Sequence, residues 1–276
     1  MELEERKKKE RDFHNKIRIV TDNDEGVLET RWSPGLEHTI ENNPMWVNMK
    51  YYAIEKKSRN FVLNWLKDNV KNKVVLDYCA GNGEDGVYVA KNGAKHVHGI
   101  DISDVSIENC KQLAIKNNVQ DKTTYIIADA ENTKFENNQF DIITEYGCLH
   151  HLDQDKAFKE LARILKEDGK VICNEALAHN LFIHLYRKMT PKLRTEWEVE
   201  HIMKKGDIMK AKKYFGNVEI HLYHLFSLFA VPFRNYFFFN TLLACLEIID
   251  RIVLKIPIVK WQAWQAVIIL SDPIKE

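Results

Sequence analysis

The sequence lacks three features that mark well-defined protein classes. It has no basic excess, because Lys and Arg together number 40 and Asp and Glu also number 40. Nucleic-acid backbones favour clustered cations, so we expect no nucleic-acid partner. No apolar run reaches the roughly 18 residues of a spanning helix. The charged start MELEERKKKERDF has no apolar region typical of a secretory signal and predicts a solvated helix or a frayed end. We expect a cytoplasmic protein.

Paired cysteine motifs are also missing. The chain has five cysteines, and no two of them have CxxC spacing: Cys79, Cys110, Cys148, Cys173 and Cys245. An odd, dispersed set in a chain of 276 residues is typical of reduced thiols, and not of a disulfide framework or a zinc site. The sequence therefore predicts free cysteines and no metal.

Strand-like runs alternate with helical patterns in the middle of the chain. The runs are 73–79, 96–101, 123–129, 140–146 and 170–177. Helical patterns lie between them, and the one over 155–165 is followed by Gly169 as a helix-terminating residue. Such alternation indicates a parallel sheet with helices on both faces. Two later runs, 217–226 and 263–270, bring the expected sheet to about seven strands.

Acidic residues end three successive strand-like runs: Asp77, Asp101 and Asp129. The carboxyl ends of parallel strands meet at one sheet edge, where ligands bind in folds of this kind. Gly81 and Gly83 follow Asp77 and let the backbone approach a ligand. Asp101 is placed to accept both hydroxyls of a ribose. Each acid alone is explained equally well as a turn or helix-cap residue, but three at one edge indicate a ligand site.

The charge of the first loop selects the kind of ligand. Glu84 and Asp85 add to Asp77, whereas a dinucleotide pyrophosphate favours helix-end amides without carboxylates beside them. A ligand with an ammonium group and a ribose suits the loop better. S-adenosylmethionine has both, together with a sulfonium.

Two long segments, VVLDYCAGNGEDGVYVAKNGAKHVHGIDISDVSIENCKQLA and IIADAENTKFENNQFDIITEYGCLHHLDQDKAFKELARILKEDGKVICNEAL, resemble the ordered motifs of class I S-adenosylmethionine-dependent methyltransferases. The resemblance implies that cofactor and a Rossmann-like α/β fold. Its seven-stranded sheet is mostly parallel with a reversed last strand, has helices on both faces and carries helical cap insertions. Cys79-Ala80 departs from the family pattern, which has Gly-Cys there.

The same resemblance assigns the cofactor-binding residues. Asp77, Gly81 and Gly83 would hold the methionine end, Asp101 the ribose and Ile102 one side of the adenine, while Asp129 and Ala130 would meet the adenine amino edge and Glu145 would lie near the methyl group. We divide the chain accordingly. Residues 1–72 form an N-terminal helical segment over the active site, and 73–177 form the cofactor-binding core. Residues 178–276 hold the last strands and two cap insertions, 178–215 and 227–260.

Methyl transfer to a hydroxyl or carbon acid needs a base, and histidine titrates near neutrality. His150 and His151 follow the fourth strand-like run. The segment after the fifth run resembles a subgroup of small-molecule methyltransferases and supplies further candidates: His179 and His201 as bases, Arg187 and Arg194 to clamp an anionic acceptor, and Asn180 and Tyr186 as other acceptor contacts. Each of these residues is also compatible with a polar surface helix.

We therefore expect a methyltransferase acting on a small, partly apolar acceptor, with oxygen slightly preferred over nitrogen or carbon. Residues 227–260 are apolar but interrupted by charges, and they predict core packing, a homodimer face, a lid or a peripheral membrane contact. One alternative is a peripheral membrane methyltransferase acting on a lipid or prenylated acceptor. Another is a non-catalytic nucleotide-binding protein, including one that binds NAD.

Overall fold

A computed structural model describes residues 4–18, 50–190, 193 and 195–275. The helices are α1 (Glu5–Arg18), α3 (Lys56–Asn69), α4 (Glu84–Lys91), α5 (Asp104–Lys116), α6 (Gln154–Ile164), α7 (Leu181–Met189), α8 (Glu196–His201), α9 (Lys205–Lys210) and α10 (Phe239–Val253). The strands are β1 (Val74–Tyr78), β2 (His96–Asp101), β3 (Thr123–Ile127), β4 (Phe140–Tyr146), β5 (Leu165–Ala176), β6 (Phe215–Tyr223) and β7 (Gln265–Pro273). The expected segment 1–72 lies partly outside the described residues.

The strands form one sheet in the order β3-β2-β1-β4-β5-β7-β6. The β1 strand pairs in parallel with β2 on one side and β4 on the other, whereas β7 runs antiparallel to β5 and β6. The expected mostly parallel sheet with a reversed last strand is confirmed. Strand order reverses beside β1, so the crevice for a ligand opens at the carboxyl ends of β1, β2 and β4.

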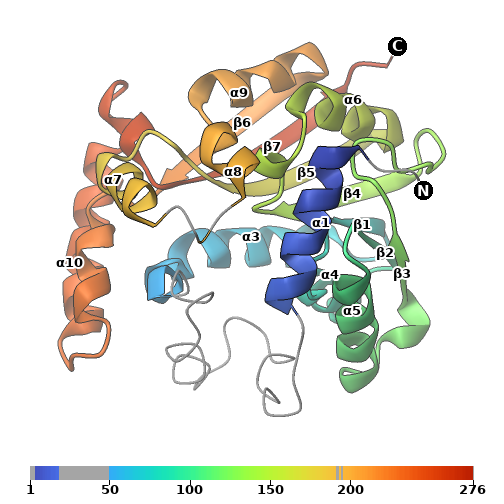
Figure 1. Ribbon diagram of the computed structural model, residues 1–276, viewed down its shortest axis with the longest axis horizontal. Helices are drawn as coiled ribbons and strands as arrows, with labels where there is room; N and C mark the ends of the chain where they lie inside the picture. Colours follow the sequence, from blue (N-terminus) through green and yellow to red (C-terminus); the bar gives the residue numbers. More distant parts are fainter. Residues whose placement is uncertain (1–3, 19–49, 191–192, 194, 276) are drawn as a thin grey trace.

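Helices cover both faces of the sheet (Figure 1). The side chains of each strand alternate between the two faces, so the sheet has an apolar cluster on either side. In β1, Val75 packs in one apolar cluster with residues of α3, α4 and α5. Its neighbour Leu76 belongs to the opposite cluster, which includes residues of α6 and α9. Both side chains are fully buried, as expected for a central parallel strand. This two-sided core fixes the strand ends that form the crevice.

The fifth strand is longer than the sequence predicts. It begins at Leu165, and its pairing with β4 shifts register between Phe140 and Ile142, which marks an irregularity next to Gly169. A Cβ added to Gly169 would lie 2.8 Å from Cγ of Leu165 and 3.0 Å from the Asp141 carbonyl oxygen. The expectation that Gly169 ends a helix is therefore wrong, because this glycine permits close packing within the sheet.

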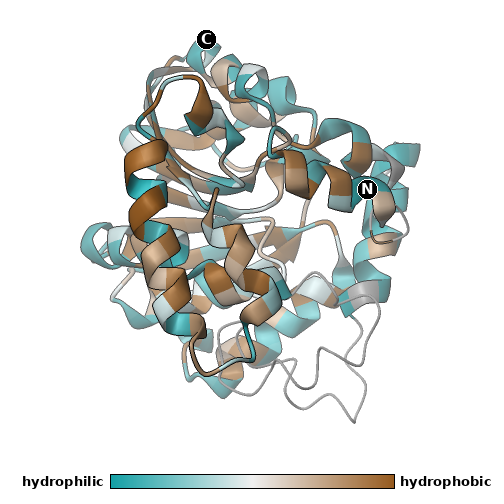
Figure 2. Ribbon diagram, turned by 90° about the vertical axis from the view of Figure 1, so that its left-hand side faces the viewer, coloured by the Kyte–Doolittle hydropathy of each residue, from teal (hydrophilic) through white to brown (hydrophobic). Residues whose placement is uncertain are grey.

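The late insertions form a separate apolar cluster beside the sheet. The short helix η6 (Ser227–Phe233) and helices α7 and α10 pack around Trp264, through Ile183, Val231 and Leu243 among others. Figure 2 shows hydrophobic segments along α7 and α10 on this side of the molecule. Among the described residues, no helix is both long and apolar enough to cross a bilayer.

Candidate functional site

The loop after β1 depends on left-handed backbone conformations. Cys79, Gly81 and Gly83 have φ values of +57°, +59° and +84°. A Cβ on Gly83 would lie 3.0 Å from Cα of Cys110, so glycine is required there by both φ and space. A left-handed φ costs a residue with a Cβ about 1–2 kcal/mol, so glycine would be the less strained residue at the position of Cys79.

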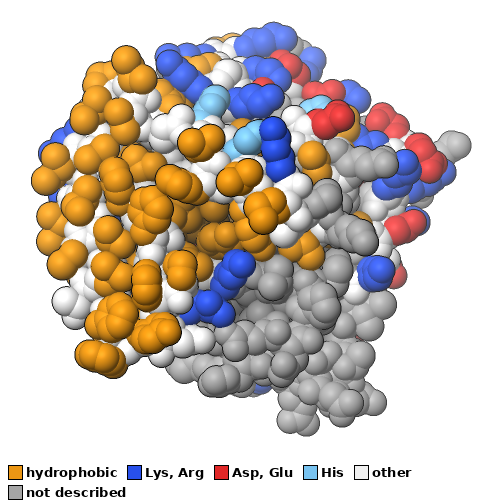
Figure 3. Space-filling view, turned by 60° about the vertical axis from the view of Figure 1, so that its left-hand side comes forward, with side chains coloured by type: hydrophobic (Ala, Val, Ile, Leu, Met, Phe, Trp, Pro, Cys, Tyr) orange, Lys and Arg blue, Asp and Glu red, His pale blue; other side chains and the backbone are white. Residues whose placement is uncertain are grey.

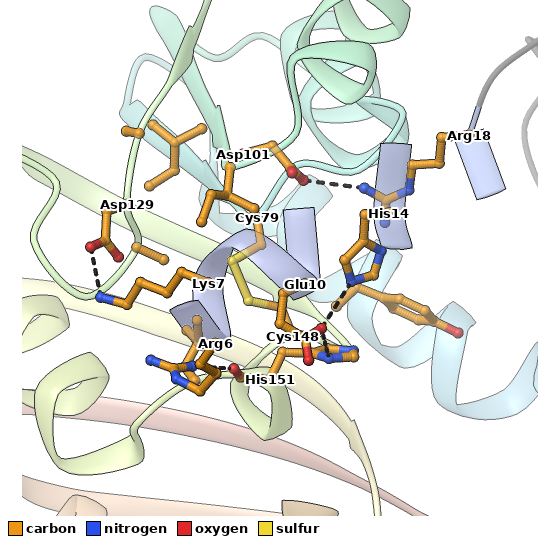
Figure 4. Close-up of a pocket in the computed structure, with 17 residues that line it drawn as sticks. Arg6, Lys7, Glu10, His14, Arg18, Cys79, Asp101, Asp129, Cys148 and His151 are labelled. Carbon is orange, nitrogen blue, oxygen red and sulfur yellow. Dashed lines mark hydrogen bonds and ion pairs between the residues drawn. A yellow bond between two sulfur atoms is a disulfide. The ribbon is translucent and has the colours of Figure 1, made fainter. Parts of the chain in front are cut away.

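One cavity lies outside the carboxyl ends of β1, β2 and β4 (Figure 4). Four of the expected cofactor residues line it: Asp101, Ile102, Asp129 and Ala130. The Asp101 carboxylate is held by backbone amides, since Oδ2 accepts from Gly81 N at 3.0 Å and Oδ1 accepts from Ser103 N at 2.9 Å. Two strand-end acids therefore face one cavity whose wall also contains apolar side chains, a combination that suits a ribose and a flat base.

A second cavity adjoins the first, and Cys79 and Tyr146 line both. Its other lining residues are charged or small: Arg59, Asp77, Ala80, Glu84 and Asp85. Burial raises the pKa of the Asp77 carboxyl, and nearby Asp85 raises it further. Arg59 is ion-paired with Asp85. A ligand ammonium group placed here would relieve the repulsion between carboxylates, whereas a pyrophosphate would increase it.

Glu145 is not among the described residues that line the two cavities. It is buried, with 1% of its surface exposed, and its carboxylate accepts the amide of Cys148. Burial raises the pKa of Glu145, and the neighbouring Glu175 adds to the rise. Glu145 therefore lies near the end of β4, where its carboxylate holds the turn after this strand, and it is not among the residues that line either cavity.

Helix α1 lies across the mouth of the first cavity (Figure 4). Lys7 Nζ lies 2.7 Å from Asp129 Oδ2, and Arg18 Nη1 lies 3.3 Å from Asp101 Oδ2. Lys7 is only 6% exposed. The expected helix is confirmed for residues 5–13, but it is neither frayed nor solvated all round, because the strand-end acids attract one side of this cationic helix. No local pattern reveals this, since the partners lie more than 80 residues away in the sequence.

The four candidate histidines have different surroundings. His150 Nδ1 lies 2.7 Å from the buried Glu175 Oε2. His179 Nε2 accepts from Lys205 N at 3.2 Å, and His201 stacks on Trp197 with ring centroids 3.6 Å apart. Of the four, His151 lines the first cavity. The sheet edge therefore brings one candidate base to the place where the cofactor residues converge.

The expected acceptor residues Asn180, Tyr186 and Arg187 are not among the described residues that line the two cavities. Asn180 is buried and caps α7: its side chain accepts from Ile183 N at 3.0 Å and donates to Gln262 O at 2.8 Å. Arg187 Nη1 donates to Leu177 O at 2.9 Å, and the Tyr186 ring contacts Tyr51. These contacts position α7. Arg194 lies outside the described residues.

Two residues of α1 join His151 in a polar cluster that the sequence analysis missed. Glu10 Oε2 lies 3.0 Å from His151 Nδ1 and 3.8 Å from His14 Nε2. Burial alone would lower the pKa of His151, but Glu10 and Glu198 outweigh it and raise that pKa. Burial lowers the pKa of His14 well below its usual value, and Arg18 adds to this effect. The sequence signal that could have revealed this pair is the spacing of Glu10 and His14, which lie one helical turn apart.

Cys79 and Cys148 form a disulfide between the loops after β1 and β4. The expectation that all five cysteines are free is therefore wrong for this pair, although Cys110, Cys173 and Cys245 are free as expected. The two cysteines lie 69 residues apart and are brought together because β1 and β4 are adjacent strands. Both line the first cavity, so the bond forms part of its wall.

Comparison with known sequences places this geometry in context. Residues 75–169 match a family profile described as "Methyltransferase domain". A curated relative from Rickettsia prowazekii, the ubiquinone/menaquinone biosynthesis C-methyltransferase UbiE, is 33% identical over 110 residues, which are 38% of this chain and 44% of the relative. The corresponding protein of Rickettsia felis is 34% identical over the same shares. The chain thus spans less than half the length of these relatives.

Solved structures share the fold at low sequence identity. The geranyl diphosphate C-methyltransferase of Streptomyces coelicolor A3(2), solved with Mg²⁺, geranyl diphosphate and S-adenosyl-L-homocysteine, is 10% identical with a TM-score of 0.60, and the match covers 99% of this chain and 100% of that one. The PH0226 protein of Pyrococcus horikoshii OT3 is 20% identical with a TM-score of 0.53, over 80% and 91% of the two chains. These likenesses concern the fold alone.

Proposed function

We propose that this chain transfers a methyl group from S-adenosylmethionine to a small, partly apolar acceptor. Its core at residues 75–169 is a methyltransferase domain of the class I S-adenosylmethionine-dependent family. One observation carries the proposal: Asp101 and Asp129 face one cavity, and an acid-rich cavity around Asp77 adjoins it. An adenosine suits the first cavity and a methionine ammonium suits the second. We retain the division at residues 1–72, 73–177 and 178–276 as part of this proposal.

The residues present fit the cofactor. The Asp101 carboxylate is oriented by two amides and faces the cavity, where ribose hydroxyls would take the place of the Arg18 contact. Ile102 and Ala130 supply apolar contacts for a base, and Asp77 and Glu84 favour a cation. When bound, S-adenosylmethionine supplies a methyl carbon already activated by its sulfonium. The protein has to align the acceptor with that carbon and exclude water, which α1 does from above the cavity.

The acceptor is expected to approach beside His151, since this candidate histidine reaches the cavity. Glu10 and Glu198 raise the pKa of His151 above its usual value despite its burial, so they favour the charged form of this ring over that of an isolated imidazole. We propose oxygen as the acceptor atom, with carbon as the alternative because the curated relatives are named as C-methyltransferases. Products made with methyl-labelled cofactor distinguish the two by the carbon chemical shift of the transferred group.

Calorimetry with S-adenosylhomocysteine tests the cofactor assignment. Asp101→Ala is expected to abolish binding, and Asp101→Asn, which keeps the side-chain shape, to weaken it at least tenfold. Asp121→Ala, at an exposed aspartate, serves as the matched control and should bind like the parent. Unchanged affinity in Asp101→Ala, or a larger thermal shift with NAD than with S-adenosylhomocysteine, would support the nucleotide-binding alternative instead.

A second candidate function is methylation of a lipid or prenylated acceptor at a membrane surface. An apolar surface on α7, η6, α10 and the segment after α10 favours it (Figure 3). Its exposed members include Phe182, Leu185, Phe237, Ile252 and Ile258, and Phe237 and Ile258 are 98% and 87% exposed. Phe239, by contrast, is buried and does not contribute. Lys188, Arg251 and Lys255 are exposed along the same elements, which suits an anionic lipid surface.

Vesicle sedimentation tests this second function. We expect the protein to sediment with anionic phosphatidylglycerol vesicles and less with neutral phosphatidylcholine vesicles. Combined replacement of Phe237 and Ile258 by serine should abolish sedimentation without loss of stability, since both side chains are exposed. Ile115→Ser, at an exposed isoleucine of α5, is the control. A doubled mass in solution that the double variant halves would instead identify the surface as a homodimer face.

A further inference from the structure

Three potential metal ligands converge at the cavity wall: Glu10, His14 and His151. One ligand atom from each lies within 4.8 Å of the others. Glu10 and His14 lie one turn apart on α1, and His151 comes from the turn η3 (Leu149–His151) after β4. Two histidines and a carboxylate are a common ligand set for divalent transition-metal ions. The set arises only when α1 docks on the sheet edge (Figure 4).

The cluster contains buried polar atoms that its own contacts do not satisfy. Glu10 is 5% exposed, yet its Oε2 has no hydrogen-bond partner in the described part of the chain, and the same is true of Nδ1 in His14 and in His151. Glu10 Oε2 and His151 Nδ1 are only 3.0 Å apart without hydrogen-bond alignment. Buried polar atoms normally find hydrogen-bond partners, so Glu10 Oε2 and His151 Nδ1, which form an ion pair without good hydrogen-bond geometry, are poorly satisfied.

The surroundings orient the carboxylate toward the histidines. Thr195 Oγ1 donates to Glu10 Oε1 at 2.5 Å, which leaves Oε2 facing His14 and His151. An outer hydrogen bond that fixes a ligand carboxylate is typical of metal centres. Ligand atoms bound to one tetrahedral ion lie roughly 3.3 Å apart, as follows from metal–ligand distances near 2.0–2.1 Å. The separations of 3.0 and 3.8 Å on either side of Glu10 Oε2 bracket that value.

We propose that Glu10, His14 and His151 bind one divalent first-row transition-metal ion at the wall of the first cavity. All three residues line this cavity, so the remaining coordination position faces the space where a small molecule enters. A bound ion would take Glu10 Oε2 and His151 Nδ1 as ligands, and His14 would reach it through Nε2, the ring nitrogen that faces Glu10. Its role in catalysis rests on the proposed function: an acceptor hydroxyl that coordinated the ion would have a lowered pKa and would release its proton to water, so no free histidine base would be required.

Titration of the full chain with Co²⁺, followed by calorimetry and visible absorption, tests the site. The metal-stripped parent is expected to bind one tight equivalent, with absorption bands typical of nitrogen and oxygen ligands. His14→Gln should weaken this binding at least tenfold while preserving the Glu10–His151 ion pair and therefore the fold. Glu10→Gln, with circular dichroism as a folding check, provides a second variant. His221→Gln is the matched control, because His221 forms an exposed pair with Glu219 at 2.7 Å.

Two results would overturn the metal site: the parent binds no tight equivalent of Co²⁺, or His14→Gln and His221→Gln have the same affinity as the parent. In either case the cluster is an ion pair beside a buried histidine. S-adenosylhomocysteine binding, measured on the same samples, separates this failure from failure of the proposed function. Cofactor binding without Co²⁺ binding refutes the metal site alone, and the reverse result refutes the methyltransferase proposal alone.

Discussion

At the scale of single residues, the structure around the carboxyl edge of the sheet depends on small side chains and on the protonation state of buried side chains. Gly99 in β2 faces Tyr125 of β3, and a Cβ at Gly99 would lie only 2.3 Å from Cδ1 of that ring. Tyr125 is 6% exposed and has little room to move. The glycine therefore allows the large ring to pack over β2, next to the strand end that carries Asp101.

Gly99→Ala is expected to lower the free energy of unfolding by about 1–3 kcal/mol, the usual cost of overpacking. Gly206→Ala is the matched control, because no atom lies within 4 Å of the added Cβ in α9. There alanine should be neutral or stabilise by up to about 1 kcal/mol. Urea unfolding of the two variants measures both effects, and equal stability of the two would contradict the packing argument.

His224 provides a pH-dependent contribution to stability. Burial, with Lys57 adding to it, lowers the pKa of His224 to about 3, and its two ring nitrogens face Ser58 and Ser227 hydroxyls at 2.9 and 3.2 Å. The unfolded chain, with a histidine pKa near ~6.5, binds the proton first as pH falls. The contribution is therefore complete above that pH and is lost progressively as pH falls toward 3.

When the pH falls from 7.5 to 5, the suppressed protonation of His224 should lower the unfolding free energy of the parent protein by about 2 kcal/mol. His224→Asn removes the titrating group and should lose about 2 kcal/mol less over the same interval. Urea titrations of both proteins at the two pH values give the comparison. Equal losses would show that the environment of His224 does not suppress its protonation.

At the scale of elements, α1 belongs to the site although it lies far from it in the sequence. Lys7 reaches Asp129 at 2.7 Å and Glu131 at 2.8 Å, so one buried ammonium group joins the helix to the loop after β3. The neighbouring acids outweigh burial and raise the pKa of Lys7 above its usual value. The helix thus remains docked by charge, with its Glu10 and His14 directed to the cavity.

Lys7→Glu should release α1, because it places a third carboxylate beside Asp129 and Glu131. Breaking a buried ion pair costs about 3–5 kcal/mol, which exceeds what a short helix retains on its own. Amide hydrogen exchange should become fast in residues 5–18 and remain slow in β1 and β4. Lys16→Glu, at an exposed position of the same helix, should leave exchange unchanged. Persistent protection in Lys7→Glu would show that apolar contacts hold the helix.

At the scale of the whole molecule, the Cys79–Cys148 disulfide links the loops on the two sides of the sheet centre. It closes a segment of 69 residues, for which the chain-entropy model gives a stabilisation of at most about 4 kcal/mol. The bond also joins two loops that line the first cavity. Its presence therefore affects both the stability of the core and the shape of the cavity wall.

Thiol counting tests this bond directly. In denaturant without reductant, a maleimide should label the three free cysteines, Cys110, Cys173 and Cys245, and reductant should raise the count to all five. Cys79→Ser should lower the unfolding free energy by up to about 4 kcal/mol. Cys245→Ser, at an exposed cysteine, should leave it unchanged. Labelling of five thiols before reduction would contradict the bond.

The sequence by itself determined the sheet and its ligand edge. Strand periodicity, Gly81 and Gly83, and the acids Asp77, Asp101 and Asp129 are local signals, because a parallel strand and its following turn are encoded within about ten residues. The reversed last strand followed from the resemblance to the methyltransferase family and agrees with β7. These signals indicated the fold and four of the cavity residues without any coordinates.

Only the tertiary structure decided which polar residues meet at the cavity. The docking of α1, the cluster of Glu10, His14 and His151, and the Cys79–Cys148 bond all join segments that are far apart in the sequence. Asn180 shows the converse, since a residue expected to contact the acceptor instead caps α7. The physical reason is common to both cases: a side chain's partners depend on which strands are adjacent and which helix covers their ends, and no local pattern encodes that.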